Sequence, residues 1–307
     1  MFKNFVYNKI FKLISLLLIL VIMLIFPIST RYELSDNNNK EIKKTKVFLL
    51  NNNDYISEVN ISLDYNSYET KIKKIIELLV IDGIYADLIP NKYKAVFPSE
   101  TKLLDIEIKN DTIILNFNDN FLGSSFNDLE NNIKLLVHNC LIDNKYNKVY
   151  IEVESKLLTN YNNISFYQPF TRDMLINVIN KTTDYKNIVK TKVFFYSKTN
   201  DIVPVTILSN QNKKKINVII DELSNSNYND LYSYMNYNVE LIDYKIQDDV
   251  MSLFFDDKIY DNKNNRVILK PVYNLLETSI INNFPIKNIK IYVNNKEIKK
   301  SSTKNVE

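Results

Sequence analysis

The sequence contains one unit written twice, and this repeat constrains the fold more than any other feature. Thr45–Leu49 (Thr-Lys-Val-Phe-Leu) recurs 146 residues later as Thr191–Phe195 (Thr-Lys-Val-Phe-Phe). Apolar residues at i, i+3, i+4 and i+7 follow in both copies, a spacing typical of one face of an amphipathic helix. These residues are Ile72, Ile75, Ile76 and Leu79 in the first copy and Ile216, Ile219, Ile220 and Leu223 in the second. The repeat therefore predicts two domains of the same fold.

Each copy continues with a hairpin, a second helix and a closing strand. Apolar residues alternate on both sides of Asn110-Asp111 and of Asp248-Asp249, as in two antiparallel strands around a turn. The matching segments are 104–117 and 242–255 for the hairpins, 133–141 and 272–280 for the helices, and 149–153 and 289–293 for the closing strands. The order βαββαβ predicts an α+β fold in which two helices of each copy cover a small mixed sheet. Because Pro271 suits the first turn of a helix, we expect the last helix to begin near Leu269.

These elements give the expected domain organisation. The first domain occupies residues 45–155 and the second occupies residues 191–297. The remaining segments are a polar linker at 31–44, a connector at 156–190 and a polar tail at 298–307. The linker lacks periodicity, so no helix or strand is predicted in it.

The N-terminus has the pattern of a membrane signal. Three lysines precede an apolar run over residues 13–28, in which Ser15 is the one polar residue. A basic region followed by an apolar region is typical of an export signal, and neither an A-x-A-like site nor a cysteine follows the run. We therefore predict an uncleaved signal anchor over residues 1–30 that crosses the cell membrane once, although the length of the run also fits a cleaved signal. The lysine-rich end is expected in the cytoplasm and residues 31–307 outside.

Composition excludes several chemistries. The 39 Lys+Arg and 36 Asp+Glu residues leave a net charge of +3, which is a weak field for nucleic acid. Two glycines cannot form the loops that hold nucleotide phosphates, and one His with one Cys cannot complete a zinc site. We therefore predict no catalytic, cofactor-binding or metal-binding residues, no nucleic-acid partner and no small-molecule substrate. The chain is expected not to be an enzyme.

His138 and Cys140 are the single residues of their kinds, so a thiol–imidazole pair is the one catalytic arrangement to consider. On a helix, residues i and i+2 point about 200° apart, so the two side chains are not expected to touch. Cys140 falls on the apolar stripe with Leu136 and Val137, which predicts a buried structural cysteine. His138 then belongs to the outer face of the helix, where we expect it to be solvated.

Two other kinds of polar segment are interpreted as solvated surface. Asn116–Asp119 and Phe254–Asp257 end matching strands with oxygen side chains, the ligands that Ca²⁺ prefers, but neither has the glycine and glutamate of an EF-hand loop. Lys213–Lys215 and Lys299–Lys300 are short basic runs. Such runs are usually solvated, and contact with anionic lipid is the alternative.

Four mostly apolar segments match the pattern of a known protein family. They are Lys102–Ile106, Gln168–Asn180, Ile202–Thr206 (Ile-Val-Pro-Val-Thr) and Asn283–Val293. Together with the tandem arrangement behind a membrane signal, they resemble the GerM domain family of sporulation and spore germination over roughly residues 45–297. The chain departs from that family in having few glycines in its loops and no cysteine at the end of the apolar run.

The resemblance implies a fold similar to the ring-building domains of secretion-type assemblies and a role without catalysis. That role is assembly of the envelope-spanning channel between mother cell and forespore. The implied partners are proteins of this channel or ring complex, and the implied location is the mother-cell membrane facing the forespore. The alternative is an extracytoplasmic binding module that regulates an envelope sensor or a cell-wall enzyme. Neither the assembly hypothesis nor the binding-module hypothesis assigns binding residues.

Overall fold

The computed structural model describes residues 44–124, 126–184, 186–261 and 266–300, together with residues 303 and 305. The predicted signal anchor over residues 1–30 lies outside the described residues, as do all but the last residue of the predicted linker and half of the predicted tail. Over the described ranges, no helix has the length and apolar character needed to cross a membrane.

The first copy consists of a long hairpin, two helices and a small sheet. In chain order its elements are β1 (Lys44–Asn51), β2 (Ile56–Ser62), α2 (Tyr68–Leu79), η1 (Ala86–Leu88), β3 (Tyr93–Lys94), β4 (Leu103–Lys109), β5 (Thr112–Phe117), η2 (Asp119–Gly123), α3 (Phe126–Cys140), β6 (Lys148–Val153) and β7 (Lys156–Leu157). β7 already lies in the segment predicted as the connector, which also contains the short strands β8 (Asn160–Tyr161), β9 (Ile164–Ser165) and β10 (Val178–Asn180).

The second copy repeats this order. Its elements are β11 (Ile188–Ser197), β12 (Ile202–Asn210), α4 (Lys215–Asn225), β13 (Leu231–Tyr232), β14 (Leu241–Gln247), β15 (Val250–Phe255), η3 (Asp257–Ile259), α5 (Lys270–Ile281), β16 (Asn288–Val293) and β17 (Lys296–Ile298). The two copies are therefore tandem α+β units with two α-helices each.

The helices begin where local chemistry favours a start. Ser67 caps α2, because its Oγ accepts a hydrogen bond from the Thr70 N–H at 3.1 Å. The predicted apolar face of α2 is buried. Leu269 is the N-cap of α5 and Pro271 lies in the first turn, which confirms the expected start of that helix.

Each copy has a small four-stranded sheet built on the predicted hairpin. The orders are β4-β5-β6-β7 and β14-β15-β16-β17, with the second and third strands of each sheet parallel. Ile106 faces Leu115 in the first copy, and Tyr244 faces Leu253 in the second. Both hairpins have a register shift at the same place, after Leu103 and after Leu241, so the predicted register is preserved between the copies.

The opening strands do not join these small sheets, and the prediction of one mixed sheet per copy is wrong in this respect. Each opening strand forms a long antiparallel hairpin with the strand that follows it. Both hairpins belong to one sheet with the order β13-β11-β12-β2-β1-β3, in which β10 also pairs with β12. The physical reason is that alternation in a sequence specifies which face of a strand is buried, whereas the choice of a partner strand depends on distant segments.

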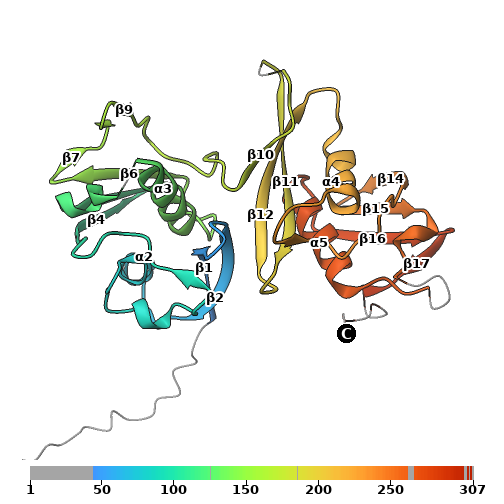
Figure 1. Ribbon diagram of the computed structural model, residues 1–307, viewed down its shortest axis with the longest axis horizontal. Helices are drawn as coiled ribbons and strands as arrows, with labels where there is room; N and C mark the ends of the chain where they lie inside the picture. Colours follow the sequence, from blue (N-terminus) through green and yellow to red (C-terminus); the bar gives the residue numbers. More distant parts are fainter. Residues whose placement is uncertain are drawn as a thin grey trace, which may run out of the picture. The chain divides into compact units, whose positions relative to one another are not determined.

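Two hydrophobic cores result, one in each copy. In the second copy, α4 and α5 pack between the hairpin β11–β12 and the small sheet (Figure 1). The first core includes Leu49, Phe117 and Leu136, and the second includes Phe195 and Leu253, all almost fully buried. Long strands and helices with one buried face thus hold each copy together, and the shared sheet joins them.

Candidate functional site at the junction of the two copies

The two copies meet where β2 lies beside β12. Glu58 is paired with Ile202 across these strands. Next to this pair, the Oδ1 atom of Asn177 accepts a hydrogen bond from the Ile56 N–H at 2.9 Å, and its Nδ2 donates to the carbonyls of Ile56 and Pro204, both at 2.7 Å. Pro204 has no N–H to offer a neighbouring strand. The side-chain amide of Asn177 therefore bridges the two hairpins where regular strand pairing stops.

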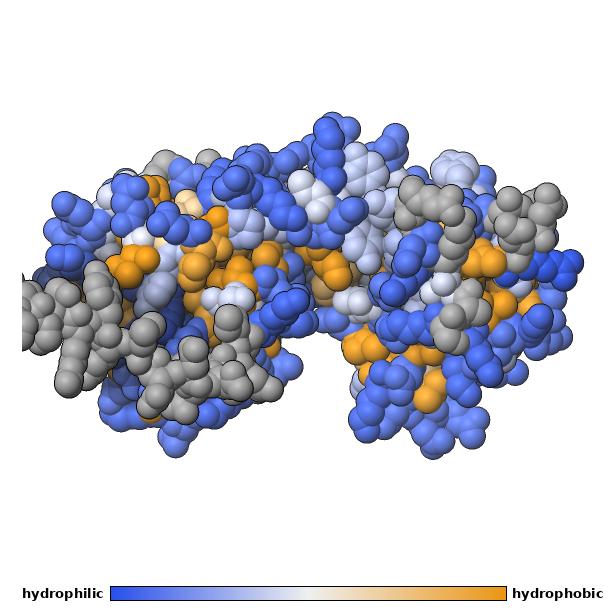
Figure 2. All heavy atoms as spheres, turned by 90° about the horizontal axis from the view of Figure 1, so that it is seen from below, coloured by the Kyte–Doolittle hydropathy of each residue, from blue (hydrophilic) through white to orange (hydrophobic). Residues whose placement is uncertain are grey.

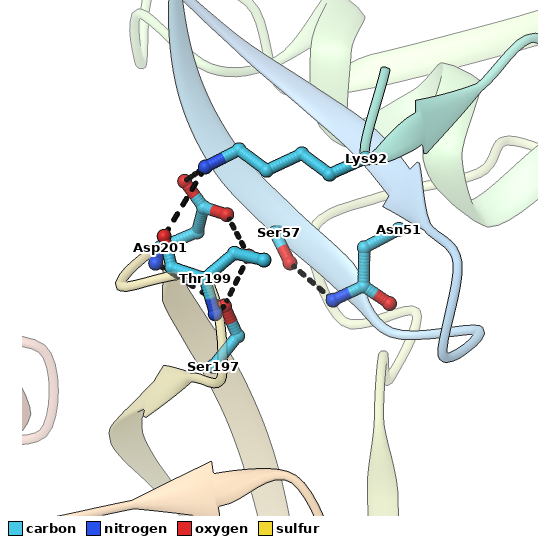
Figure 3. Close-up of polar contacts among 6 residues, drawn as sticks. All are labelled: Asn51, Ser57, Lys92, Ser197, Thr199 and Asp201. Carbon is cyan, nitrogen blue, oxygen red and sulfur yellow. Dashed lines mark hydrogen bonds and ion pairs between the residues drawn. The ribbon is translucent and has the colours of Figure 1, made fainter. Parts of the chain in front are cut away.

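An ion pair also joins the copies (Figure 3). The Nζ atom of Lys92, just before β3, lies 2.8 Å from Oδ1 of Asp201, just before β12, and donates to the carbonyl of Thr199 at 3.2 Å. The Thr199 hydroxyl donates to Oδ2 of Asp201 at 2.6 Å. Burial opposes ionisation of Asp201, but the hydrogen bonds from Lys92 and Thr199 outweigh it, so the pKa of Asp201 lies below its ordinary value. Because the Asp201 side chain is only 14% exposed, salt screens this pair less than it screens a surface pair.

The outer edge of each long hairpin is closed by an asparagine from the second helix of its copy or from the turn that follows that helix. In the first copy, Asn139 of α3 accepts from the Phe48 N–H and donates to the Phe48 carbonyl, both at 2.8 Å. In the second, Asn283 follows α5 and makes the same two bonds with Lys192, at 3.0 and 2.6 Å. Because each amide supplies the donor and acceptor that a neighbouring strand would supply, these edge groups are satisfied without further strand pairing.

His138 is buried, so the prediction of a solvated position is wrong. Its side of α3 is covered by the connector, and its Nε2 lies 2.8 Å from the carbonyl oxygen of Met174. The ring also contacts Phe48 edge to face. Burial lowers the pKa of His138, and the nearby Lys192 and Arg172 lower it further, against the hydrogen bond with Met174. The imidazole is therefore neutral at pH 7, and its role here is structural.

Cys140 lies in the core of the first copy, as predicted. Burial raises the pKa of its thiol to about 12. A thiol with this pKa is protonated at neutral pH and is a poor nucleophile.

The oxygen side chains at the matching strand ends contact the protein. Asn116 accepts from the Ser155 N–H at 2.9 Å, and Asp256 lies 3.1 Å from the Nζ of Lys258. Within the described part of the chain, no group of three or more His, Cys, Asp or Glu side chains is placed to hold a metal ion.

The two basic runs lie at the surface. Lys213 and Lys214 are exposed before α4. Lys300 forms an ion pair with Glu277 of α5. Part of the second basic run therefore interacts with the protein's own α5 helix.

Five exposed apolar side chains lie in the loops that lead from the first helix of each copy to its hairpin. We call these segments, residues 80–102 and 226–240, the apolar loops. The first carries Ile81, Ile84 and Leu88, and the second carries Tyr232 and Tyr237; Ile84 and Tyr237 are 80% and 70% exposed. Figure 2 shows hydrophobic side chains at the surface of both copies. Exposed apolar side chains in the corresponding loops of both copies are typical of a contact surface for another protein.

Comparison with known proteins points to one family. Residues 46–159 match the model of the Germane family, described as sporulation and spore germination. Over 266 residues, 82% of this chain and 71% of the relative, the chain is 23% identical to the spore germination protein GerM of Bacillus subtilis (strain 168). Together these findings support a protein of the GerM domain family.

The tandem arrangement also has a solved counterpart among GerM structures. The tandem GerMN domains of the sporulation protein GerM from Bacillus subtilis superpose with a TM-score of 0.73 and 21% identity, covering 86% of this chain and 94% of that one. At this identity the likeness concerns the fold. It supports two consecutive GerM domains, of which the family model matches the first.

The residues at the junction were not singled out by the sequence. Asn177, Lys92 and Asp201 lie in a connector or a loop, where no periodicity marks them. Asn177 has a positive φ of 49°, a conformation that asparagine tolerates better than most residues, but an asparagine in a connector does not by itself indicate a bridge. Such contacts depend on which segments the fold brings together.

Proposed function

We propose that this chain is a non-catalytic sporulation protein that helps to assemble the envelope-spanning channel complex between mother cell and forespore through protein–protein contacts. The observation that carries the proposal is the relationship to the spore germination protein GerM, which extends over 82% of this chain. This relationship supports a role in sporulation. Assembly of the channel complex is a more specific part of the proposal.

The apolar loops are the proposed contact surfaces. Ile84 and Tyr237 are large apolar side chains that face solvent, one in the apolar loop of each copy. Burying such side chains against a partner is favourable by about 1.5–3 kcal/mol each. Two similar surfaces on one chain would let it contact two neighbouring subunits of a ring.

We further propose that residues 1–30 anchor the chain in the mother-cell membrane facing the forespore. The lysine-rich end is then cytoplasmic and the two GerM domains lie outside that membrane. This location would bring the apolar loops to partners in the space between the two membranes.

The test is a count of heat-resistant spores after deletion of the gene in its native host. We expect the count to fall by several orders of magnitude and the intact gene to restore it. A chain carrying both Ile84→Lys and Tyr237→Lys should accumulate normally but restore few spores, because the two charges prevent burial of the loops.

Leu157→Lys is the matched control, because Leu157 is an exposed apolar residue on β7, outside the apolar loops. This variant should restore the full count. A normal count in the deletion strain would contradict the proposal and favour an envelope-binding module instead. Full restoration by the loop variant would contradict the assignment of the contact surfaces.

A further inference from the structure

A groove crosses the shared sheet and is separate from the apolar loops. It has a volume of about 280 Å³. Side chains from β1, β2, β11 and β12 line it, together with residues of α3 and α5. Both copies therefore contribute to one cavity.

Apolar side chains form a large part of its lining. Phe48 of β1 and Phe194 of β11 occupy matching positions of the repeat, and Ile202 and Pro204 of β12 lie between the two copies. These surfaces suit an apolar body, and aromatic rings at the walls favour a flat one.

Among the described residues that line this groove, the charge of Lys192 is not compensated. Lys46 and Glu58 pair with each other at 2.5 Å, and the imidazole of His138 is held by the Met174 carbonyl. The Lys192 ammonium is half-buried and, among the residues that the structure describes, has no carboxylate at ion-pair distance. A partly buried cation without a counter-ion costs free energy, and an anion bound beside it would offset that cost.

We infer that this groove binds a small organic monoanion, a carboxylate with an aromatic body, which places its carboxylate against Lys192 and its ring against Phe48 and Phe194. A cavity of about 150 Å³ holds benzene. The volume of about 280 Å³ therefore fits a molecule of about a dozen non-hydrogen atoms. A single lysine suits one carboxylate. This binding activity goes beyond the proposed assembly function and does not depend on it.

The test is a titration of the full chain, held in lipid nanodiscs, with 3-(4-fluorophenyl)propionate as the probe observed by ¹⁹F NMR. Empty nanodiscs give the blank. The neutral probe 3-(4-fluorophenyl)propan-1-ol has nearly the same body without the carboxylate. We expect saturable binding of the carboxylate with a Kd on the order of 1 mM or tighter, and at least fivefold weaker binding of the alcohol.

Lys192→Met separates the charge from the shape of the site, because methionine keeps an apolar stem and removes the ammonium. It should weaken binding of the carboxylate at least fivefold and leave the alcohol unchanged. Lys190→Met is the matched control, since Lys190 is exposed on the same strand outside the groove, and it should change neither probe.

Thr278→Trp places a large ring in the groove from α5 and should abolish binding of both probes. Equal affinity for the acid and the alcohol, or unchanged binding by the Lys192→Met chain, would overturn the inference. So would the absence of saturable binding by the unaltered chain up to about 10 mM.

Discussion

At the residue scale, three asparagine side chains take the place of strand backbone in this protein. Asn139, Asn177 and Asn283 each accept from one N–H and donate to at least one carbonyl of a strand edge. An amide side chain has the same donor and acceptor as a peptide group, and in asparagine it lies close to the backbone. These residues therefore satisfy edge groups that would otherwise be buried without partners.

Asn177→Gly tests the bridge between the copies. Glycine accepts the positive φ of this position, so the substitution removes the amide without adding backbone strain. Three hydrogen bonds are lost, and we expect the free energy of unfolding to fall by about 1–3 kcal/mol, as measured by urea denaturation. Asn163→Gly is the control, because Asn163 also has a positive φ but lies exposed in the β8–β9 turn. A similar loss in both variants would show that the amide bonds of Asn177 contribute nothing specific.

His138 gives the protein a pH-dependent stability. Its pKa in the folded chain is lowered, mainly by burial, so the unfolded chain binds the proton more readily. Stability should therefore be full above the unfolded pKa of about 6.5 and should fall as the pH drops below that value. His138 is the one histidine of the chain, so few other groups titrate in this window.

The measurement is urea denaturation at about pH 7.5 and pH 5.5, on the unaltered chain and on His138→Gln. We expect the unaltered chain to lose stability at the lower pH and the glutamine variant to lose much less. An equal loss in both chains would place the pH dependence elsewhere.

At the scale of elements, the features that depend on residues close together in the sequence were predictable. Both helices of each copy, the small hairpins with their register, and the start of α5 follow from apolar spacing, turn residues and Pro271. The pairing of the two opening hairpins did not follow, because a strand's alternation does not name its partner. His138 was misplaced for a similar reason: the connector that covers it lies 36 residues away along the chain.

The same limit applies to the candidate site. The burial of Cys140 was predictable, because its neighbours on the helix face are apolar. The bridge of Asn177, the Lys92–Asp201 pair and the groove position of Lys192 depend on strands from different copies that lie side by side only after folding.

The first apolar loop depends on a close backbone approach at Gly83. A Cβ atom at this position would lie 2.2 Å from the carbonyl oxygen of Glu77 in α2, so alanine requires the turn after the helix to move. We expect Gly83→Ala to lower the free energy of unfolding by about 1–3 kcal/mol. Gly123→Ala is the control, because its Cβ would lie 3.4 Å from Pro98, and it should change stability by less than about 0.5 kcal/mol. Thermal unfolding of both variants makes the comparison, and equal melting temperatures would contradict the role given to Gly83.

At the scale of the whole molecule, the two copies of the repeated unit are joined by a shared sheet. Each copy keeps its own core and its own small sheet. The long hairpins are joined between copies by the pairing of β2 with β12 at Glu58 and Ile202, supported by Asn177 and by the Lys92–Asp201 pair. The groove forms because strands of both copies lie in one sheet. The same sheet connects the domains that carry the two apolar loops.

The shared sheet is most directly tested by the distance between one spin label in each copy, measured by double electron–electron resonance on the full chain. Lys73→Cys on α2 and Asp221→Cys on α4 place the labels at exposed helix positions. Cys140 does not need to be replaced, because it is buried and its thiol is protonated. A continuous sheet predicts a single narrow distance distribution. A broad distribution, as expected for two domains on a flexible connector, would contradict the shared sheet and the junction and groove that depend on it.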